Sequence, residues 1–402
     1  MDAIPSTLAA LSVPVDTLRH YGKNPRSGDV DTIVESLRIN GQYRPVVVNK
    51  RTNEVLAGNH TLKAARQLGW TEIAATYVDV DEEQAARIVL VDNRSNDLAT
   101  YDERALAALL SDLSALEGSG FDDAAQQELL DRVTDLPPPL PEPDALPERP
   151  PPTSKPGDVW LLGPHRVICG DSSDVAVLDA LMMGASADLV WTDPPYGVAY
   201  QAKGHKAIAN DELGVAELTD FLRETLGAAL TASRPGACWY VAAPAGPPFL
   251  AFAVVLTEFG VWRQTISWVK NAIVLGHSDY HYQHEAILYG WSPGAPHQPP
   301  PDRKQSTVWE FPKPKANRDH PTQKPVALIE KSIANSTDRG DLVLDVFGGS
   351  GSTLIACHQQ ARVARLVELD AGYVDVICRR YQDATGVAPV LESTGEPHDF
   401  GG

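Results

Sequence analysis

The stretch LVLDVFGGSGSTLIACHQQARVARLVELD, residues 342–370, determines the class of fold that this chain adopts. An apolar run at Leu342–Val346 predicts a strand, the glycines after it predict a tight turn, and Ser352–His358 predicts the first turns of a helix. A second apolar run, Ala364–Leu369, predicts the next strand. A strand, a glycine turn, a helix and a strand in this order indicate one unit of a parallel α/β sheet.

The glycine turn predicts a ligand site. Gly348, Gly349 and Gly351 let the backbone approach a bound molecule closely, and the following helix offers unpaired N–H groups at its positive end. Glu368 ends the next strand about 20 residues later, where an acid typically binds ribose hydroxyls. The pattern predicts an adenosine-bearing cofactor. Spacing alone leaves nicotinamide, flavin and S-adenosylmethionine open, and a tight turn in an unrelated α/β protein is the structural alternative.

Strands and helices alternate through the rest of the C-terminal part. This alternation predicts an α/β fold, a mostly parallel sheet with helices on both faces. The predicted strands are Ala187–Trp191, Ala237–Ala242 and Thr265–Val269, and the predicted helices are Leu218–Ala232, Phe249–Phe259 and Pro325–Ser336.

A second motif, Asp193-Pro194-Pro195-Tyr196, follows a predicted strand at residues 188–192. Ligands of open α/β sheets bind beyond the carboxyl ends of strands, and two prolines leave carbonyl oxygens free of strand pairing. An acid, fixed carbonyls and an aromatic face suit a planar heterocycle with an exocyclic amine. Two acceptors on the amine hydrogens would direct its lone pair toward a methyl group on a sulfonium. In duplex DNA such a base must first leave the stack. A proline-stiffened turn is the alternative.

Composition limits the classes of protein to consider. The 402 residues include 34 basic and 53 acidic side chains, a net charge of −19, which argues against nonspecific coating of nucleic acid. The length predicts two or three domains. No apolar run approaches the roughly 18 residues of a membrane helix, and residues 1–16 lack a secretory pattern. We therefore expect a cytoplasmic protein without a membrane partner.

The sequence predicts no metal site. The four cysteines are far apart and form no CxxC pair, so a disulfide framework and a cysteine zinc site are both disfavoured. In HSDYHYQHE, residues 277–285, His281 and His284 would project from opposite faces of a strand, so one metal ion could not easily use both.

A proline-rich stretch divides the chain. Residues 136–157, LPPPLPEPDALPERPPPTSKPG, predict an extended, solvated linker, which we assign to residues 136–156, because proline removes donors and fixes φ. The other predicted parts are a small α+β domain at 1–95, a helical extension at 96–135, a second domain at 157–390 and a partly disordered tail at 391–402. The first two parts should contain strands at Pro45–Asn49, Val55–Leu56 and Ile73–Val80, and helices at Thr61–Leu68, Asp81–Leu90, Tyr101–Leu116 and Ala124–Val133.

At these motifs the second domain resembles the amino-DNA methyltransferases that use S-adenosylmethionine, in the β-type order in which DPPY precedes the cofactor loop. HPTQKP at 320–325, CGDSSD at 169–174 and ELDAGYVDVICRR at 368–380 are further matches. The resemblance implies a Rossmann-like methyltransferase fold with a target-recognition region at 270–319. It implies target-base roles for Asp193, Pro194, Pro195 and Tyr196, and cofactor contacts by Asp171 (adenine), Glu368 (ribose), Thr322 and Lys324 (near the methionine carboxylate), Asp345, Phe347, Gly348, Gly349, Ser350 and Gly351.

One basic stretch stands out against the acidic average. Residues 303–324 carry six Lys and Arg against Glu310 and Asp319, six minus two or +4, in a chain of −19. A cationic face with aromatic residues suits contact with phosphates and bases, and a solvated basic loop is the alternative. The candidate DNA-binding residues are Arg303, Lys304, Lys313, Lys315 and Arg318, together with the aromatic residues Trp309 and Phe311.

The front domain resembles the ParB N-terminal fold. The resemblance covers residues 13–93 and is carried by GQYRPVVVNKRTNEVLAGNHTLKAARQLGW at 41–70. Gly58–Gly69 would place a turn and a helix start where such folds can bind nucleotide phosphates. His60 and Thr61 stand where ParB proteins have an arginine pair, so a docking or DNA-positioning module is favoured over nucleotide hydrolysis.

Together these patterns predict a site-specific DNA methyltransferase acting on double-stranded DNA, and a homodimer is compatible with them. In the family that it resembles, DPPY accompanies adenine-N6 more often than cytosine-N4, so adenine is favoured. Cytosine-N4 methylation, RNA methylation, and a DNA-binding partition-like protein with a decayed methyltransferase domain are the alternatives. The intact Asp193, Tyr196, Asp345 and Glu368 count against decay.

Overall fold

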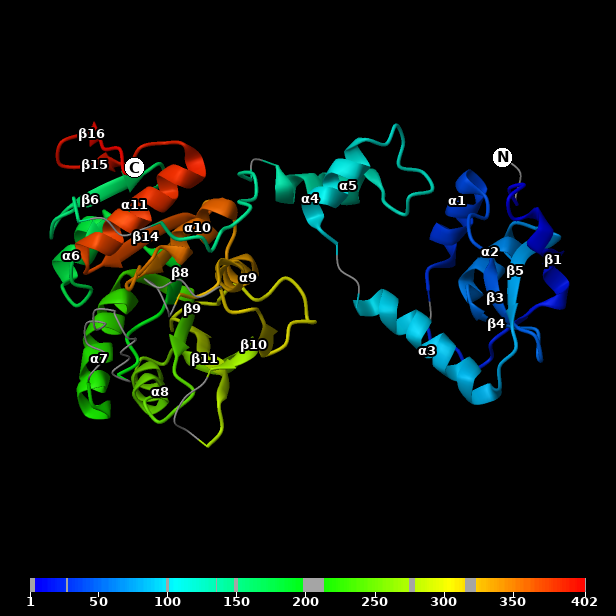
Figure 1. The fold of residues 1–402 in the computed structure, drawn as a ribbon, viewed down its shortest axis with the longest axis horizontal. Helices are drawn as coiled ribbons and strands as arrows, with labels where there is room; N and C mark the ends of the chain where they lie inside the picture. The colour runs from blue at the N-terminus through cyan, green and yellow to red at the C-terminus, as the bar shows by residue number, and fades with distance from the viewer. Residues whose placement is uncertain are drawn as a thin grey trace. The chain divides into compact units, whose positions relative to one another are not determined.

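The computed structural model describes residues 4–26, 28–98, 101–134, 136–147, 151–197, 213–274, 279–314 and 323–401. The chain divides into two compact units, Met1–Asp135 and Leu136–Gly402, each with hydrophobic cores of its own (Figure 1). No helix in the described part of the chain is long and apolar enough to cross a membrane.

The first unit is a small α+β domain followed by a pair of helices. Its five-stranded sheet has the order β1-β5-β3-β4-β2, and α1 and α2 pack together, with Leu37 and Leu62 buried in the same core as Val48. The strands are β1 Ser12–Pro14, β2 Arg19–His20, β3 Val46–Asn49, β4 Glu54–Ala57 and β5 Glu72–Val78. The helices are α1 Val30–Asn40, α2 Asn59–Gln67, α3 Glu82–Leu98, α4 Glu103–Ser111 and α5 Asp123–Val133, with 3-10 turns η1 Ala9–Leu11 and η2 Val15–Thr17.

The second unit contains an 11-stranded mixed sheet in the order β12-β10-β11-β9-β8-β13-β14-β7-β6-β15-β16. Its central strands β9, β8, β13, β14 and β7 are parallel, and the antiparallel pair β10–β11 extends the sheet beside β9. The strands are β6 Val159–Leu162, β7 His165–Cys169, β8 Ala187–Thr192, β9 Ser233–Ala243, β10 Trp262–Val274, β11 Tyr282–Trp291, β12 Val308–Glu310, β13 Leu342–Asp345, β14 Val363–Glu368, β15 Val390–Leu391 and β16 Glu396–Pro397. The helices are α6 Val175–Met182, α7 Val215–Thr231, α8 Phe249–Glu258, α9 Val326–Ser336, α10 Ser352–Gln359 and α11 Ala371–Thr385.

The central strands are buried on both faces because successive side chains enter different cores. Leu189 and Trp191 of β8 pack in a cluster with α9, α10 and α11, whereas Val190 packs in a cluster with α6, α7 and α8. In β13, Val343 and Leu344 divide between the same two clusters. Burial on both faces explains the continuous apolar runs and confirms the predicted α/β class.

Most elements that the sequence predicts are present, but the helices α1 and α11 were not predicted, and three elements near the linker were also missed. β6, β7 and α6 precede the DPPY motif without having been predicted. In β7 the buried residues include His165 and Arg166, so this strand has no apolar run to mark it. β10 is also longer than the predicted Thr265–Val269, since it continues past the polar Lys270 and Asn271 to Val274, which pairs with Tyr282 of β11.

The proline-rich segment is not the solvated linker that the sequence predicts. Its described residues form no helix or strand and include a turn at 142–145, and they pack on the second unit. The Leu140 N–H donates to Gln359 Oε1 at 3.0 Å, and the Thr153 N–H donates to Asp375 Oδ2 at 2.6 Å. Proline prevents helix and strand pairing here, but it leaves the other backbone groups free to bond to the folded domain.

The C-terminal tail is also ordered, contrary to the predicted disorder. β15 pairs with β6, and the Phe400 ring lies 4.9 Å from the Trp160 ring. The Phe400 N–H donates to Gln382 Oε1 at 2.9 Å. Glycine in this segment forms the turn of a small hairpin, with Gly395 at a φ of +70°.

Candidate active site at the carboxyl ends of the central strands

The sequence motifs meet at one edge of the large sheet. The parallel neighbours β8, β13, β14 and β7 lead into Asp193, the glycine turn, Glu368 and the CGD sequence at 169–171. Thr192 Oγ1 donates to Asp345 Oδ1 at 3.0 Å, and the Gly170 N–H donates to the Glu368 carbonyl at 3.0 Å. DPPY and the glycine turn therefore follow adjacent strands and are joined by a side-chain hydrogen bond.

The glycine turn closes on the end of β14. Gly351 precedes α10 with a φ of +83°, and a Cβ at this position would lie 3.0 Å from Ile377 Cγ1. Gly349 has a φ of +50°, and its N–H donates to Glu368 Oε2 at 2.7 Å. Both positions favour glycine, and the turn leaves the N-terminus of α10 at the edge of the sheet where an anionic or polar ligand group is favoured.

Glu368 has the bonding pattern expected of a ribose-binding acid. Its Oε1 accepts from the Asp370 N–H at 2.8 Å, while Oε2 accepts from Gly349, so both oxygens are held in place by the backbone. Each carboxylate oxygen has two lone pairs and can accept a further hydroxyl. Burial raises the pKa of Glu368 to about 7. The residues present therefore fit an adenosine cofactor.

Asp345 holds neighbouring elements of the site together by hydrogen bonds. Its Oδ1 accepts from Thr192 and from the Phe347 N–H at 3.1 Å, and its Oδ2 accepts from Thr353 Oγ1 at 2.6 Å. The side chain is buried, and burial raises the pKa of Asp345 to about 6. It joins the end of β8 to the glycine turn and to α10.

The remaining predicted cofactor residues lie around the same turn, with one exception. Asp171 is exposed just after β7, and Phe347 is half-buried beside Gly348 and Ser350 in the turn. Thr322 lies outside the described residues.

The structure places Lys324 on the DPPY acid. Lys324 Nζ donates to Asp193 Oδ1 and Oδ2 at 2.8 and 2.7 Å, and its side chain is 6% exposed. Burial alone would lower the pKa of Lys324, but Asp193 and Glu285 hold it above its usual value. Burial also raises the pKa of Asp193, and Lys324 opposes that shift. Lys324 thus pairs with Asp193 of the DPPY motif, and its predicted place near the methionine carboxylate stays a prediction.

Tyr196 is fixed by a second acid, Glu285. The Tyr196 hydroxyl donates to Glu285 Oε2 at 3.0 Å, and the Phe252 ring packs edge-on at 6.0 Å. Lys324 Nζ lies 5.1 Å from the centre of the Tyr196 ring. Burial opposes ionisation of Glu285, but Lys324 and Lys270 lower its pKa to about 2. Glu285 therefore orients the tyrosine as a carboxylate.

Glu285 and Lys270 are the site residues that sequence reasoning missed. Lys270 Nζ lies 2.5 Å from Glu285 Oε1, and Lys324 Nζ lies 3.2 Å from Glu285 Oε2. Lys270 belongs to β10 and Glu285 to β11, where Trp268 pairs with Glu285. One lysine and one glutamate in neighbouring predicted strands are only weak sequence evidence for an ion pair. The register of the β10–β11 hairpin is needed to show that the two side chains meet.

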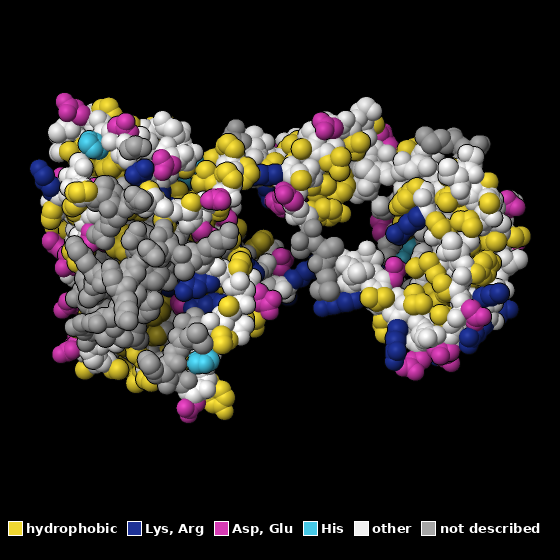
Figure 2. All heavy atoms as spheres, in the orientation of Figure 1, with side chains coloured by type: hydrophobic (Ala, Val, Ile, Leu, Met, Phe, Trp, Pro, Cys, Tyr) yellow, Lys and Arg dark blue, Asp and Glu magenta, His cyan; other side chains and the backbone are white. Residues whose placement is uncertain are grey.

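The basic stretch is described only in part. Arg303, Lys304 and Lys313 are exposed, whereas Lys315 and Arg318 lie outside the described residues. In the view of Figure 2, Lys and Arg side chains of the second unit gather in the region of β9 to β11. Burial lowers the pKa of Lys313, with Lys270 as the next cause, which places this lysine beside the DPPY network.

The predicted aromatic contacts with bases are wrong for Trp309. This side chain is 3% exposed and packs in the core with its ring 6.1 Å from Tyr240. Phe311 is half-buried against the same core. Lys331 Nζ covers Trp309 at 4.8 Å from the ring centre. β12 pairs with β10, so alternation turns Trp309 inward and leaves its neighbours outside.

Within the described residues no group of three or more His, Cys, Asp or Glu side chains is arranged to hold a metal ion.

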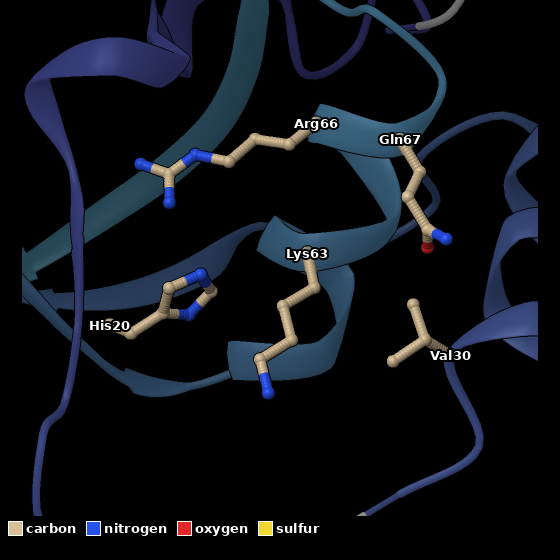
Figure 3. A pocket seen from close by; sticks show the side chains of 5 residues that line it. All are labelled: His20, Val30, Lys63, Arg66 and Gln67. Carbon is tan, nitrogen blue, oxygen red and sulfur yellow. The ribbon is translucent and has the colours of Figure 1, made fainter.

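A hollow on the first unit is the other candidate ligand site, and it is lined by His20, Val30, Lys63, Arg66 and Gln67 (Figure 3). Arg66 is partly committed, since its Nη2 donates to the Leu18 carbonyl at 2.8 Å. His60 accepts the Gly28 N–H at 2.9 Å through Nε2, and burial lowers the pKa of His60. His60 therefore acts as a neutral acceptor within the fold. A docking role for this domain stays a prediction.

Residues 187–379 match a family described as DNA methylase, and residues 8–94 match the ParB N-terminal domain. YubD of Escherichia coli (strain K12) is 31% identical over 210 residues, which cover 49% of this chain and 81% of YubD. The DNA adenine methyltransferase YhdJ of the same strain is 25% identical over 231 residues, which cover 50% of this chain and 78% of YhdJ. Among solved structures, the crystal structure of the M1.HpyAVI-SAM complex is similar over 53% of this chain and 98% of the M1.HpyAVI chain. The sequence identity is 23% and the TM-score is 0.40.

The fold and the site define an α/β enzyme with an adenosine-type cofactor turn beside a DPPY tetrapeptide. The chain belongs to the DNA methylase family and carries a ParB-like domain in front of it. It is an S-adenosyl-L-methionine-dependent DNA methyltransferase of the group that modifies exocyclic amines, which confirms the predicted family and cofactor. The mostly parallel central sheet with helices on both faces confirms the predicted fold class.

Proposed function

We propose that this enzyme methylates the N6 amine of adenine in double-stranded DNA, and that the adenine is extruded into the space beside Tyr196. The observation that carries the proposal is the hydrogen bond that joins the end of β8 to the end of β13. Thr192, the residue before Asp193, donates to Asp345 at the start of the glycine turn. An amine bound at Asp193 would therefore lie beside a cofactor bound at the turn.

Residues at the ends of β13, β14 and β7 would hold S-adenosyl-L-methionine. Glu368 would accept from the ribose hydroxyls, the backbone of Gly348–Gly351 would lie against the cofactor, and Asp171 would contact adenine. When bound, this group supplies an electrophilic methyl on a sulfonium sulfur. Displacement at that methyl depends mainly on orientation and electrostatics, which the rigid strand ends provide.

Tyr196 and Asp193 would hold the target base. The Tyr196 ring is kept in one orientation by Glu285 and Phe252, as stacking requires. Asp193 and the carbonyls of Pro194 and Pro195 would accept the two amine hydrogens. These acceptors favour a pyramidal nitrogen whose lone pair is free to attack. Extrusion of the base costs a few kcal/mol, which stacking and these hydrogen bonds offset.

Lys324 would regulate access to the Asp193 oxygens. In this structure it holds both of them, and Glu285 Oε2 lies within 3.2 Å of the same ammonium. A small shift toward Glu285 would free a lone pair of Asp193 for the amine. The nitrogen gains positive charge as it is methylated, and Asp193, which would accept one of its hydrogens, would stabilise that charge and take up the proton that the amine then loses.

The exposed lysines of residues 303–314 would contact the phosphates next to the extruded base. Lys313 supports this placement, because its N–H donates to Asn271 Oδ1 at 3.1 Å, one residue from Lys270 of the site network. Lys304 precedes β12 in the chain, whereas Lys313 follows it. The role of this surface is to position DNA, since phosphate contacts carry no sequence information directly.

The experiment that tests the proposal is methyl transfer from tritium-labelled S-adenosyl-L-methionine to duplex DNA, followed by mass analysis of the nucleosides. We expect N6-methyladenine in DNA. N4-methylcytosine would establish the alternative base with the same architecture. Label in RNA only, or no label with cofactor bound, would overturn the proposal.

A further inference from the structure

The proline-rich segment supplies the cap of α9, the helix that follows Lys324. Pro325, the N-cap of α9, makes no side-chain cap hydrogen bond. Asp144 Oδ1 accepts from the Val326 N–H at 2.8 Å instead. A carboxylate at a helix N-terminus satisfies an otherwise unpaired donor and interacts favourably with the helix dipole. The start of α9 therefore depends on a residue about 180 positions earlier in the chain.

The same segment contacts Gln323, the residue before Lys324. Gln323 Nε2 donates to the Asp144 carbonyl at 3.3 Å and to Ser352 Oγ at 3.2 Å. Ser352 is the first residue of α10, directly after the glycine turn. Gln323 and Val326 flank Lys324, which holds Asp193. Asp144 therefore contacts both sides of the lysine, the Gln323 side chain through its carbonyl and the Val326 backbone through its carboxylate.

A buried arginine joins this segment to the glycine turn. Arg380 Nη1 donates to the Ser350 carbonyl at 2.6 Å, and Nη2 donates to the Pro143 carbonyl at 2.7 Å. The Arg380 side chain is buried. Burial lowers the pKa of Arg380 to about 10, and Asp144 opposes that shift. Residues 143 and 144 thus complete a hydrogen-bonded frame around the cofactor turn and Lys324.

We infer that Asp144 is a positioning residue for methyl transfer, which acts through Val326 and Gln323 on Lys324 and the cofactor turn. The inference rests on the proposed function. It means that the proline-rich segment is part of the catalytic unit, and that the site is incomplete without residues placed before the methyltransferase motifs.

The test compares Asp144→Ala, Asp144→Asn and Glu142→Gln in the full chain. The Glu142 side chain is exposed two residues away and serves as the matched control. Calorimetry measures S-adenosyl-L-methionine affinity, labelled transfer measures kcat, and hydrogen exchange follows peptides covering 323–336. Asp144→Ala should bind the cofactor on the order of tenfold more weakly, with lower kcat and faster exchange at the start of α9. Asp144→Asn retains an acceptor oxygen and should stay within about threefold of wild type. Glu142→Gln should match wild type.

The inference is overturned if Asp144→Ala keeps wild-type affinity and kcat, even where its melting temperature falls, because the cap would then serve stability alone. Equal losses in Asp144→Ala and Glu142→Gln would also overturn it. Wild-type chain that binds no cofactor would instead contradict the proposed function. In that case the exchange of residues 323–336 still decides whether Asp144 caps α9.

Discussion

Two carboxylates and two lysines balance one another beside Tyr196. Asp193 and Glu285 share Lys324, and Lys270 completes the set on the far side of Glu285. Both lysines are only 6% exposed, so each depends on its partners to offset the cost of burying a charge. Removing one of these four side chains should therefore change the ion pairs that the other three make.

Changing Glu285 to glutamine should lower kcat about tenfold and leave cofactor affinity unchanged. The amide can still accept from Tyr196, but it no longer balances Lys270 and Lys324, so Lys324 should bind Asp193 more tightly. Labelled transfer gives kcat and calorimetry gives the affinity. His284→Ala, an exposed neighbour, is the control. Wild-type kcat in Glu285→Gln would show that the charge has no part in the reaction.

Cofactor affinity should rise with pH because of Glu368. Its pKa of about 7 means that acid leaves a protonated carboxyl, whereas the ionised form accepts both ribose hydroxyls. Affinity should increase from about pH 6 to about pH 8, and Glu368→Gln should remove that dependence. Calorimetry at these pH values measures the cofactor affinity of the wild type and of Glu368→Gln. A wild-type affinity independent of pH would exclude Glu368 as the ribose acceptor.

The same carboxyl affects stability in the opposite direction. The folded pKa of Glu368 lies above the ordinary value near 4.3, so the folded chain binds more protons than the unfolded chain between the two values. Its contribution to the free energy of unfolding is present at low pH and is lost as the pH rises through about 7. In the proposed function, bound cofactor would donate hydrogen bonds to the ionised form.

At the scale of elements, β12 anchors the basic segment. Trp309 is buried against the core, and β12 pairs with β10 in the register Trp268 to Trp309. The chain is thus fixed at one point, with Lys304 before it and Lys313 after it. The buried Trp309 side chain anchors the segment, and in the proposed function the exposed Lys304 and Lys313 would contact DNA.

Changing Lys304, Lys313 and Lys315 together to alanine should weaken DNA binding and flatten its dependence on salt. Each lost phosphate contact should reduce the slope of log K against log salt by about 0.9. Binding of labelled duplex at several salt concentrations gives the slope, with the exposed Lys155→Ala as control. An unchanged slope in the triple variant would rule out this surface.

At the scale of the whole molecule, local patterns predicted the fold better than the site. The glycine turn and DPPY each follow a strand that is buried on both faces. Such a strand appears in the sequence as an apolar run, so the position of each motif at a strand end can be predicted directly. Glu285, Lys270 and Asp144 instead enter the site through strand register and long-range packing. A proline-rich segment reads as a solvated linker because no periodic pattern marks the contacts of Leu140 and Asp144 with the folded domain.

The central claim is that cofactor binding and base binding use neighbouring but separate parts of one sheet edge. Asp193 lies on the base side, and Glu368 and the glycine turn lie on the cofactor side. The most direct measurement is cofactor affinity and methyl transfer to duplex DNA in the same preparations of wild type and Asp193→Ala. We expect affinity within about threefold of wild type, and transfer reduced at least about 100-fold. Full transfer by Asp193→Ala would contradict the account.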